Sequence, residues 1–108
     1  MLFPKLTIAT VKKMYKVVFS PHSRSNLKDI SLFIAEDNVI RAVTFIDEMM
    51  VYFTQRLSNF PLSSPKVKGE IRMLPYKRYG ILYIVDEVNA VVKVLHIVSG
   101  RQDWSEWN

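Results

Sequence analysis

The hydrophobic pattern of this chain changes its period once, and that change limits the folds it can adopt. Between residues 21 and 58, apolar side chains recur every three or four positions, as they do along one face of an α-helix. From residue 69 onward they alternate with polar residues or form continuous apolar runs, which is typical of β-strands. A short β-branched and aromatic segment, Tyr15–Phe19, comes before both regions and predicts one further strand. Helices and strands that occupy separate parts of the chain indicate an α+β domain.

Two consecutive helices are expected in the first half. Ser20 and Pro21 suit the N-cap and the first helical position, and the apolar spacing carries this helix to Ala35. A polar break at residues 36–38 separates it from a second helix, which should run from Val39 to Ser58. The expected core stripe of the second helix is Val39, Val43, Ile46, Met50, Phe53 and Leu57, widened by Ala42 and Met49. The short break predicts an antiparallel helical hairpin.

Three strands should follow a loop rich in proline and serine at residues 59–65. They are expected at Gly69–Leu74, Tyr79–Val85 and Ala90–Val98, joined by short turns. The last strand is apolar on both faces, which indicates that it has neighbours on both sides. The predicted order is therefore β-α-α-β-β-β, with the helical hairpin packed on a small, mainly antiparallel sheet.

Composition excludes several classes of protein. The 108 residues include 15 Lys+Arg and 10 Asp+Glu, for a net charge of +5, and 49% are hydrophobic, so the chain is expected to fold rather than stay disordered. It has no cysteine and two histidines, which removes disulfides, thiolate zinc sites and three-histidine metal sites. We therefore expect no metal and no cofactor, and cysteine usage fits the cytoplasm. No segment has the roughly 20 apolar residues of a membrane-spanning helix.

Residues 1–13 precede a second methionine, Met14, and the first clear strand. We expect them to be an N-terminal extension, derived from a vector or from an upstream start, and residues 14–108 to form the domain. The alternative is a short native strand from Leu6 to Val11 that pairs with the sheet.

Several strings, taken in order, resemble the ParE family of the RelE/ParE toxin–antitoxin superfamily, also called plasmid stabilisation proteins. The strings are Tyr15–Pro21, Asn26–Ile30, Ala42 with Phe45 and Ile46, Gly69–Leu74, Tyr79–Tyr83 and His96–Trp104. The resemblance covers about residues 14–104. It implies a cytoplasmic toxin that forms a hetero-oligomer with a cognate antitoxin, whose flexible segment folds along apolar grooves of the toxin.

Two functions are open within this superfamily. ParE-like members bind and poison DNA gyrase, whereas RelE-like members cut messenger RNA on the ribosome. RelE-like chains carry an arginine where Gly80 stands, a Lys-x-Lys pair where this chain has Ile71–Met73, and a Tyr or His-Tyr end where it has Trp104–Asn108. These differences favour a gyrase inhibitor without catalytic residues. The alternative is an mRNA endoribonuclease that uses Arg72, His96 and Arg101, and a third hypothesis is a member that binds antitoxin but is no longer toxic.

Candidate target-binding residues come from a basic segment and from the C-terminal tail. Five basic residues and one acidic residue lie within 13 positions between Lys66 and Arg78. The candidates are Arg72, Lys77, Arg78, Arg101 and Trp104, because forked cations and large aromatic rings dominate protein interfaces. The simpler interpretations are a solvated hairpin rim, an exposed pair between Arg101 and Asp103, and a tryptophan that covers an edge of the core.

Candidate antitoxin-binding residues lie beside the main stripe of the second helix. Phe45, Val51 and Tyr52 are expected to be exposed apolar groups there, with ordinary packing at the fringe of the core as the alternative.

His96, a candidate catalytic residue of the endoribonuclease hypothesis, also has a structural interpretation. It falls in phase with Val92, Val94 and Val98, which predicts a histidine packed against the sheet rather than an acid–base group.

Overall fold

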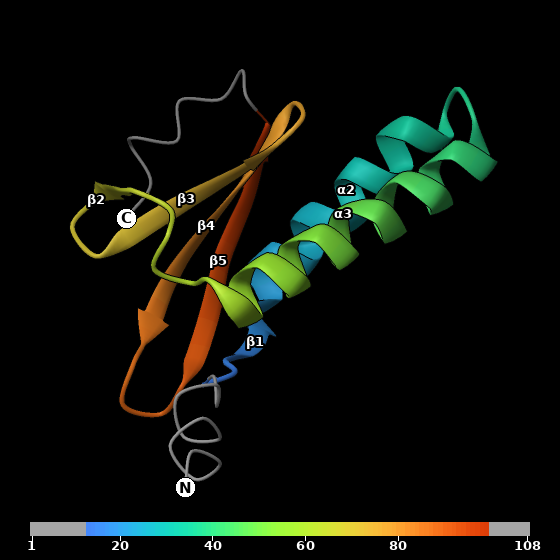
Figure 1. The fold of residues 1–108 in the computed structure, drawn as a ribbon. Helices are drawn as coiled ribbons and strands as arrows, with labels where there is room; N and C mark the ends of the chain where they lie inside the picture. Colours follow the sequence, from blue (N-terminus) through green and yellow to red (C-terminus); the bar gives the residue numbers. More distant parts are fainter. Residues whose placement is uncertain (1–12, 100–108) are drawn as a thin grey trace, which may run out of the picture.

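The computed structural model describes residues 13–99 and confirms the predicted α+β fold (Figure 1). A short strand, a pair of long helices and a run of antiparallel strands follow one another in the expected order. The elements are β1 (Lys16–Phe19), α2 (Pro21–Ala35), α3 (Val39–Asn59), β2 (Lys66–Lys68), β3 (Ile71–Tyr76), β4 (Tyr79–Asp86) and β5 (Val91–Ser99).

One mixed sheet holds all five strands in the order β1-β5-β4-β3-β2. β1 pairs with β5 in parallel, and the other three pairings are antiparallel. The strand β2 was not expected, because Lys66–Lys68 is too short and too basic to show an apolar pattern. Gly69, expected to begin a strand, instead lies in the β2–β3 turn with a φ of +55° that suits glycine.

The start of α2 is joined to β5 by hydrogen bonds. The Ser20 hydroxyl accepts from the N–H of Ser23 as an N-cap and donates to the Leu95 carbonyl at 2.9 Å. The N–H of Ser20 donates to the Val94 carbonyl, and the N–H of Ile97 donates to the Asn26 side-chain carbonyl at 3.0 Å. Beyond the end of β1, Ser20 and Asn26 therefore form the hydrogen bonds to the backbone of β5 that a longer β1 would have formed.

A β-bulge in β5 changes which face its side chains occupy. Tyr83 lies opposite Val94 and Leu82 lies opposite His96, so Leu95 is the extra residue. Because one extra residue reverses the alternation, His96 lies on the face opposite Val94. The expectation that His96 is in phase with Val92 and Val94 is therefore wrong, although it does share a face with Val98.

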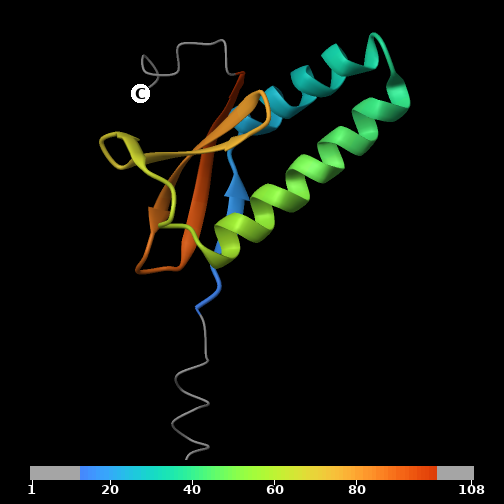
Figure 2. The ribbon, with the colours of Figure 1, turned by 45° about the horizontal axis from the view of Figure 1, so that its top comes forward.

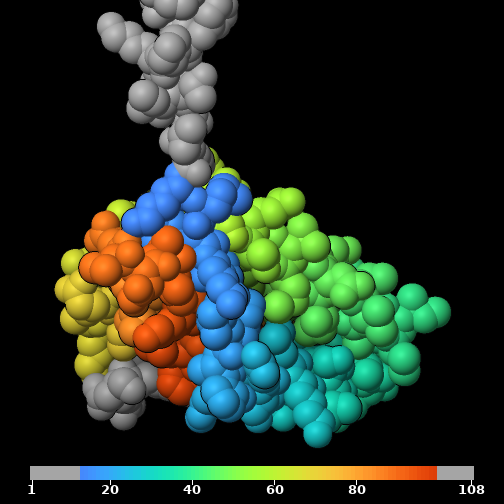
Figure 3. All heavy atoms as spheres, turned by 90° about the horizontal axis from the view of Figure 1, so that it is seen from below, coloured from blue at the N-terminus to red at the C-terminus, as the bar shows by residue number. Residues whose placement is uncertain are grey.

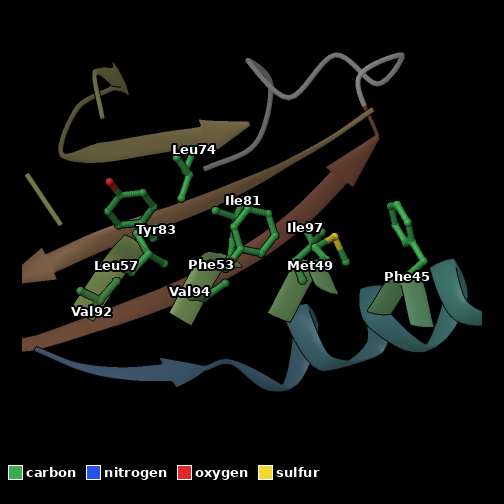
Figure 4. Packing of buried hydrophobic residues seen from close by; sticks show 10 residues of the cluster. All are labelled: Phe45, Met49, Phe53, Leu57, Leu74, Ile81, Tyr83, Val92, Val94 and Ile97. Carbon is green, nitrogen blue, oxygen red and sulfur yellow. The ribbon is translucent and has the colours of Figure 1, made fainter. Parts of the chain in front are cut away.

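The helix α3 packs on the sheet through a stripe that is rotated from the expected one toward Phe45, while Phe53 and Leu57 are buried as expected. Its buried residues are Ala42, Phe45, Met49, Phe53 and Leu57, and the last four pack in one cluster with side chains of β3, β4 and β5 (Figure 4). Val39 and Val43, expected in the core, are 66% and 58% exposed. The hairpin extends past the sheet (Figures 1 and 2), so residues at the start of α3 have no sheet beneath them.

Replacing Ser20 by alanine should lower the free energy of unfolding by about 1–2 kcal/mol, because the helix cap and the bond to the Leu95 carbonyl are both lost. Thermal melting should show a drop of about 4–8 °C for each kcal/mol. Ser25→Ala, an exposed change inside α2, is the matched control and should leave the midpoint unchanged or slightly raised. Equal melting of the two variants would contradict the proposed role of the cap.

Candidate functional site

The turn between β3 and β4 is the most basic hairpin turn of the described chain and lies against α3. The Phe45 ring on α3 is 6.0 Å from the Tyr76 ring and 5.7 Å from the Tyr79 ring, measured between centroids. The Tyr52 ring is 5.0 Å from the Tyr76 ring. The Lys77 ammonium is 5.7 Å from the centroid of Phe45 and 5.6 Å from that of Tyr76. Aromatic and cation–π contacts therefore hold this turn against the middle of the helix.

Lys77 has a backbone conformation that lysine rarely adopts. Its φ is +54°, in the left-handed region, which costs a non-glycine residue about 1–2 kcal/mol. Arg78, the next residue, is exposed. The turn therefore presents two neighbouring cations on a backbone that the aromatic contacts help to hold.

The expected antitoxin-binding residues have three different environments. Phe45 is 8% exposed and belongs to the core, so the expectation that it is an exposed residue is wrong. The reason is the rotation of the buried stripe of α3, which turns Phe45 toward Tyr76 and Tyr79. Tyr52 is half-buried beside Tyr76, and Val51 is 56% exposed.

Arg72 holds the loop between α3 and β2. Its guanidinium donates to the carbonyls of Ser64, at 2.6 Å, and Leu62, at 3.2 Å. Tyr83, directly opposite Arg72 in the sheet, donates its buried hydroxyl to the Pro61 carbonyl at 2.7 Å, and burial raises the pKa of this hydroxyl. Sequence reasoning missed the role of Tyr83, whose only signal was a polar atom within an apolar strand.

Another part of the basic segment has its charge balanced. Lys66 forms an ion pair with Glu70 at 3.2 Å across the β2–β3 turn. Lys77 and Arg78 are thus the exposed candidates of this segment, and Lys77 also lies against the Phe45 and Tyr76 rings.

The side chain of Met73 fills the space beside Gly80. It is buried in β4, and a Cβ added there would lie 2.9 Å from the Met73 sulfur. Real Cβ atoms essentially never approach so closely, so Met73 would have to move. The position at which RelE-like chains carry an arginine is therefore filled by a neighbouring side chain.

His96 lies beside a second histidine at the start of α2. Its ring centroid is 4.3 Å from that of His22, with the rings nearly perpendicular. Burial lowers the pKa of His96, and the charge of a protonated His22 lowers it further. Because Leu82 and Tyr83 are consecutive and point to opposite faces, their partners His96 and Arg72 also lie on opposite faces of the sheet. Arg101 and Trp104 lie outside the described residues.

Neither a metal cluster nor a membrane span is found between residues 13 and 99. No group of three or more His, Asp or Glu side chains in this part of the chain could hold a metal ion. Within the same residues, no helix combines the length and the apolar character that crossing a membrane requires.

Comparison with known families agrees with this arrangement. A family described as the ParE toxin of the type II toxin–antitoxin system parDE matches residues 17–104. The chain belongs to the ParE toxin family. No match was found among curated proteins.

Two solved structures share the fold of this ParE-family chain. The toxin–antitoxin complex RelBE2 from Mycobacterium tuberculosis matches with a TM-score of 0.63 and 18% identity over 80% of this chain and 91% of that chain. The chromosomal ParDE toxin–antitoxin system from P. aeruginosa matches with a TM-score of 0.66 and 12% identity over 82% of this chain and 98% of that chain. At these identities the likeness shows the fold alone, which is common to RelE-type and ParE-type toxins.

Replacing Arg72 by methionine should destabilise the ParE-family fold by about 2 kcal/mol, because a charged donor to two carbonyls is lost. Urea denaturation is the measurement, and Arg78→Met, which removes an exposed guanidinium from the turn, is the control with little expected change. If both variants unfold at the wild-type urea concentration, Arg72 does not hold the loop.

Stability should fall as the pH decreases through and below about 6.5, the ordinary pKa of histidine. The pKa of His96 is lowered in the folded state, so the unfolded chain binds the proton more readily and acid favours unfolding. Melting temperatures at pH 7.5 and pH 5.5 should therefore differ less for His96→Gln than for the wild type. An unchanged difference would contradict this role of His96.

Proposed function

We propose that this toxin acts in the cytoplasm by binding DNA gyrase, that it does so without cutting RNA, and that a cognate antitoxin neutralises it. The observation that carries the proposal is the placement of the candidate catalytic groups. Arg72 and His96 point to opposite faces of the sheet, and Arg72 is bound to two loop carbonyls.

Cleavage of RNA by its own 2′-hydroxyl requires a base, an acid and cations that converge on one phosphate. A sheet separates Arg72 from His96, so these two groups cannot meet at a single phosphate. Position 80 also carries no cation, because it is a glycine against which Met73 packs. Both observations favour a function that depends on binding.

The proposed target surface is the turn at Lys77 and Arg78. Both cations are exposed, and the Lys77 ammonium lies over the Phe45 and Tyr76 rings, so the target meets at least one charge whose position is held. Such preorganisation lowers the entropy cost of binding. Arg101 and Trp104 extend the proposed surface from the C-terminal segment, and Arg72 supports it through the α3–β2 loop.

The proposed antitoxin surface is the exposed apolar face of the helical hairpin. Within residues 13–99, large apolar side chains of α2 and α3 that are more than half exposed are Leu32, Phe33, Val39, Ile40, Val43 and Val51. Large apolar side chains left exposed on one hairpin favour an interaction site there. Val51 adjoins Tyr52, which contacts Tyr76 in the basic turn, so an antitoxin that reached Tyr52 would lie next to the proposed target surface.

The deciding experiment compares purified protein in gyrase supercoiling assays and in ribosome-dependent RNA cleavage assays. We expect loss of supercoiling and intact message. Cleavage of message on ribosomes with normal gyrase activity would overturn the proposal in favour of a RelE-type endoribonuclease. Activity in neither assay, with antitoxin binding retained, would support a member that is no longer toxic.

Reversing both charges of the turn, with Lys77→Glu and Arg78→Glu, should weaken gyrase inhibition at least roughly tenfold, because opposing charges then meet the target. Lys28→Glu, an exposed change on α2, is the control and should keep full inhibition. Melting curves of both variants establish that they remain folded. Full inhibition by the folded turn variant would place the target surface elsewhere.

A further inference from the structure

The sheet face opposite the helical hairpin carries two buried apolar side chains, Leu82 on β4 and Val98 on β5. They are 2% and 1% exposed, yet neither belongs to the core cluster between α3 and the sheet. Leu82 lies between Ile81 and Tyr83, both in that cluster, so its side chain points to the other face. Val98 follows Ile97, a further member of the cluster, and points away from it in the same way. The rear face of the sheet is therefore shielded from water at these two positions.

Gly80 shows which other side chains share this rear face. A Cβ added to Gly80 would lie 2.9 Å from the Met73 sulfur and 3.8 Å from a methyl carbon of Val98, so both side chains lie on that side. His96, which pairs with Leu82, lies there as well. Met73, Leu82 and Val98 thus form an apolar patch across β3, β4 and β5, which we call the rear patch. A sheet face that meets water normally carries polar residues, so the rear patch indicates a cover.

The helices and the α3–β2 loop pack on the core side of the sheet. α3 buries its stripe there, and side chains of α2 pack against the same cluster. The loop is bound to that side too, because the Tyr83 hydroxyl donates to the Pro61 carbonyl. At the margin of the rear face, the His22 ring lies 4.3 Å from the His96 ring. Within residues 13–99, neither helix nor this loop lies over the rear patch.

The C-terminal segment, residues 100–108, starts next to the rear patch. β5 ends at Ser99, directly after the patch, and an extended chain spans about 3.3 Å per residue, so few residues suffice to cross back over it. Residues 1–12 enter from the other end of the sheet. Figure 3 shows β1 at the surface, along the sheet edge between β5 and the helices. Just before β1, the Lys13 ammonium donates to the Glu87 carbonyl in the β4–β5 turn at 2.6 Å.

Tryptophan is the apolar residue of the C-terminal segment. Both tryptophans of the chain, Trp104 and Trp107, belong to it, and its other residues are polar or glycine. A tryptophan ring removes a large apolar area from water when it is buried, and its N–H still finds a partner at the wet side. The segment therefore carries the kind of side chain that an apolar patch of three residues requires.

We propose that the C-terminal segment folds back over the rear patch, where a tryptophan ring covers Leu82 and Val98. A second copy of this chain is not needed for this, because both side chains are already shielded within a single chain. Apolar contact between the ring and the patch stabilises the docked segment.

Docking makes the C-terminal segment a neighbour of the basic turn. Ser99 pairs with Tyr79, so the segment begins beside Lys77 and Arg78. Arg101, two residues after Ser99, then lies within reach of these cations. For target binding this arrangement rests on the proposed function, whereas the docking itself does not.

Thiol labelling tests the docking, because the chain has no cysteine and an introduced one is its only thiol. Val98→Cys places the thiol in the rear patch, and Val94→Cys, the matched control, places it in the core on the other face. Each is made in the full chain, with and without Trp104→Ala and Trp107→Ala. Loss of the two rings should speed labelling of Val98→Cys at least roughly tenfold and leave labelling of Val94→Cys slow.

Three results would overturn the docking. Equally slow labelling of Val98→Cys with and without the tryptophans, in folded chains, would assign the cover to residues 1–12. Fast labelling of Val98→Cys with the tryptophans present would show that the patch is open. Labelling that slows as the protein concentration rises would assign the patch to a second copy of the chain.

Tryptophan fluorescence of the unmodified chain is a second measurement, which stays decisive if the variant without tryptophans fails to fold. Because both tryptophans lie in residues 100–108, the emission reports this segment alone. We expect emission at shorter wavelength, and weaker quenching by acrylamide, than for the same chain unfolded in urea. Emission and quenching equal to those in urea would overturn the docking. Neither measurement contains gyrase, so failure of the docking and failure of the proposed function are distinguishable.

Discussion

The extra residue in β5 determines how the two layers of this protein meet. Leu95 has no partner in β4, and its carbonyl accepts the hydroxyl of Ser20, which caps α2 at the same time. One side chain thus fixes the end of β1, the start of the helical hairpin and the bulge of the neighbouring strand. The direction in which the hairpin leaves the sheet, and the separation of His96 from the core side chains of β5, both depend on this junction.

A second junction joins the middle of α3 to the basic turn. Phe45 and Tyr52 project from the helix, Tyr76 and Tyr79 from the strands, and the Lys77 ammonium lies over two of these rings. Residues that are far apart in sequence, and that were assigned to two different partners, form one cluster. A partner that contacts Tyr52 therefore lies next to the turn that we propose for the target, because Tyr52 contacts Tyr76.

The order of elements could be predicted because hydrophobic period and capping residues are local properties. Ser20, Pro21 and Asn38 mark the helix starts, and the alternation after residue 69 marks the strands. The buried face of α3 could not be predicted in the same way. Val39 and Val43 are as apolar as Phe45 and Met49, and the face that α3 turns toward the sheet, together with the short reach of the sheet under the hairpin, decides which of them are covered. The phase of His96 depended on a bulge, and the role of Arg72 depended on carbonyls eight and ten residues away, neither of which leaves a pattern in the sequence.

The packing of Met73 against Gly80 couples the side chains that these two positions can hold. Any side chain at position 80 meets the Met73 sulfur, so the thioether has to turn to another rotamer to make room. Methionine is flexible enough to do so, but it then gives up the contact that fills the space over Gly80. Substitutions at positions 73 and 80 are therefore expected to have non-additive effects on stability.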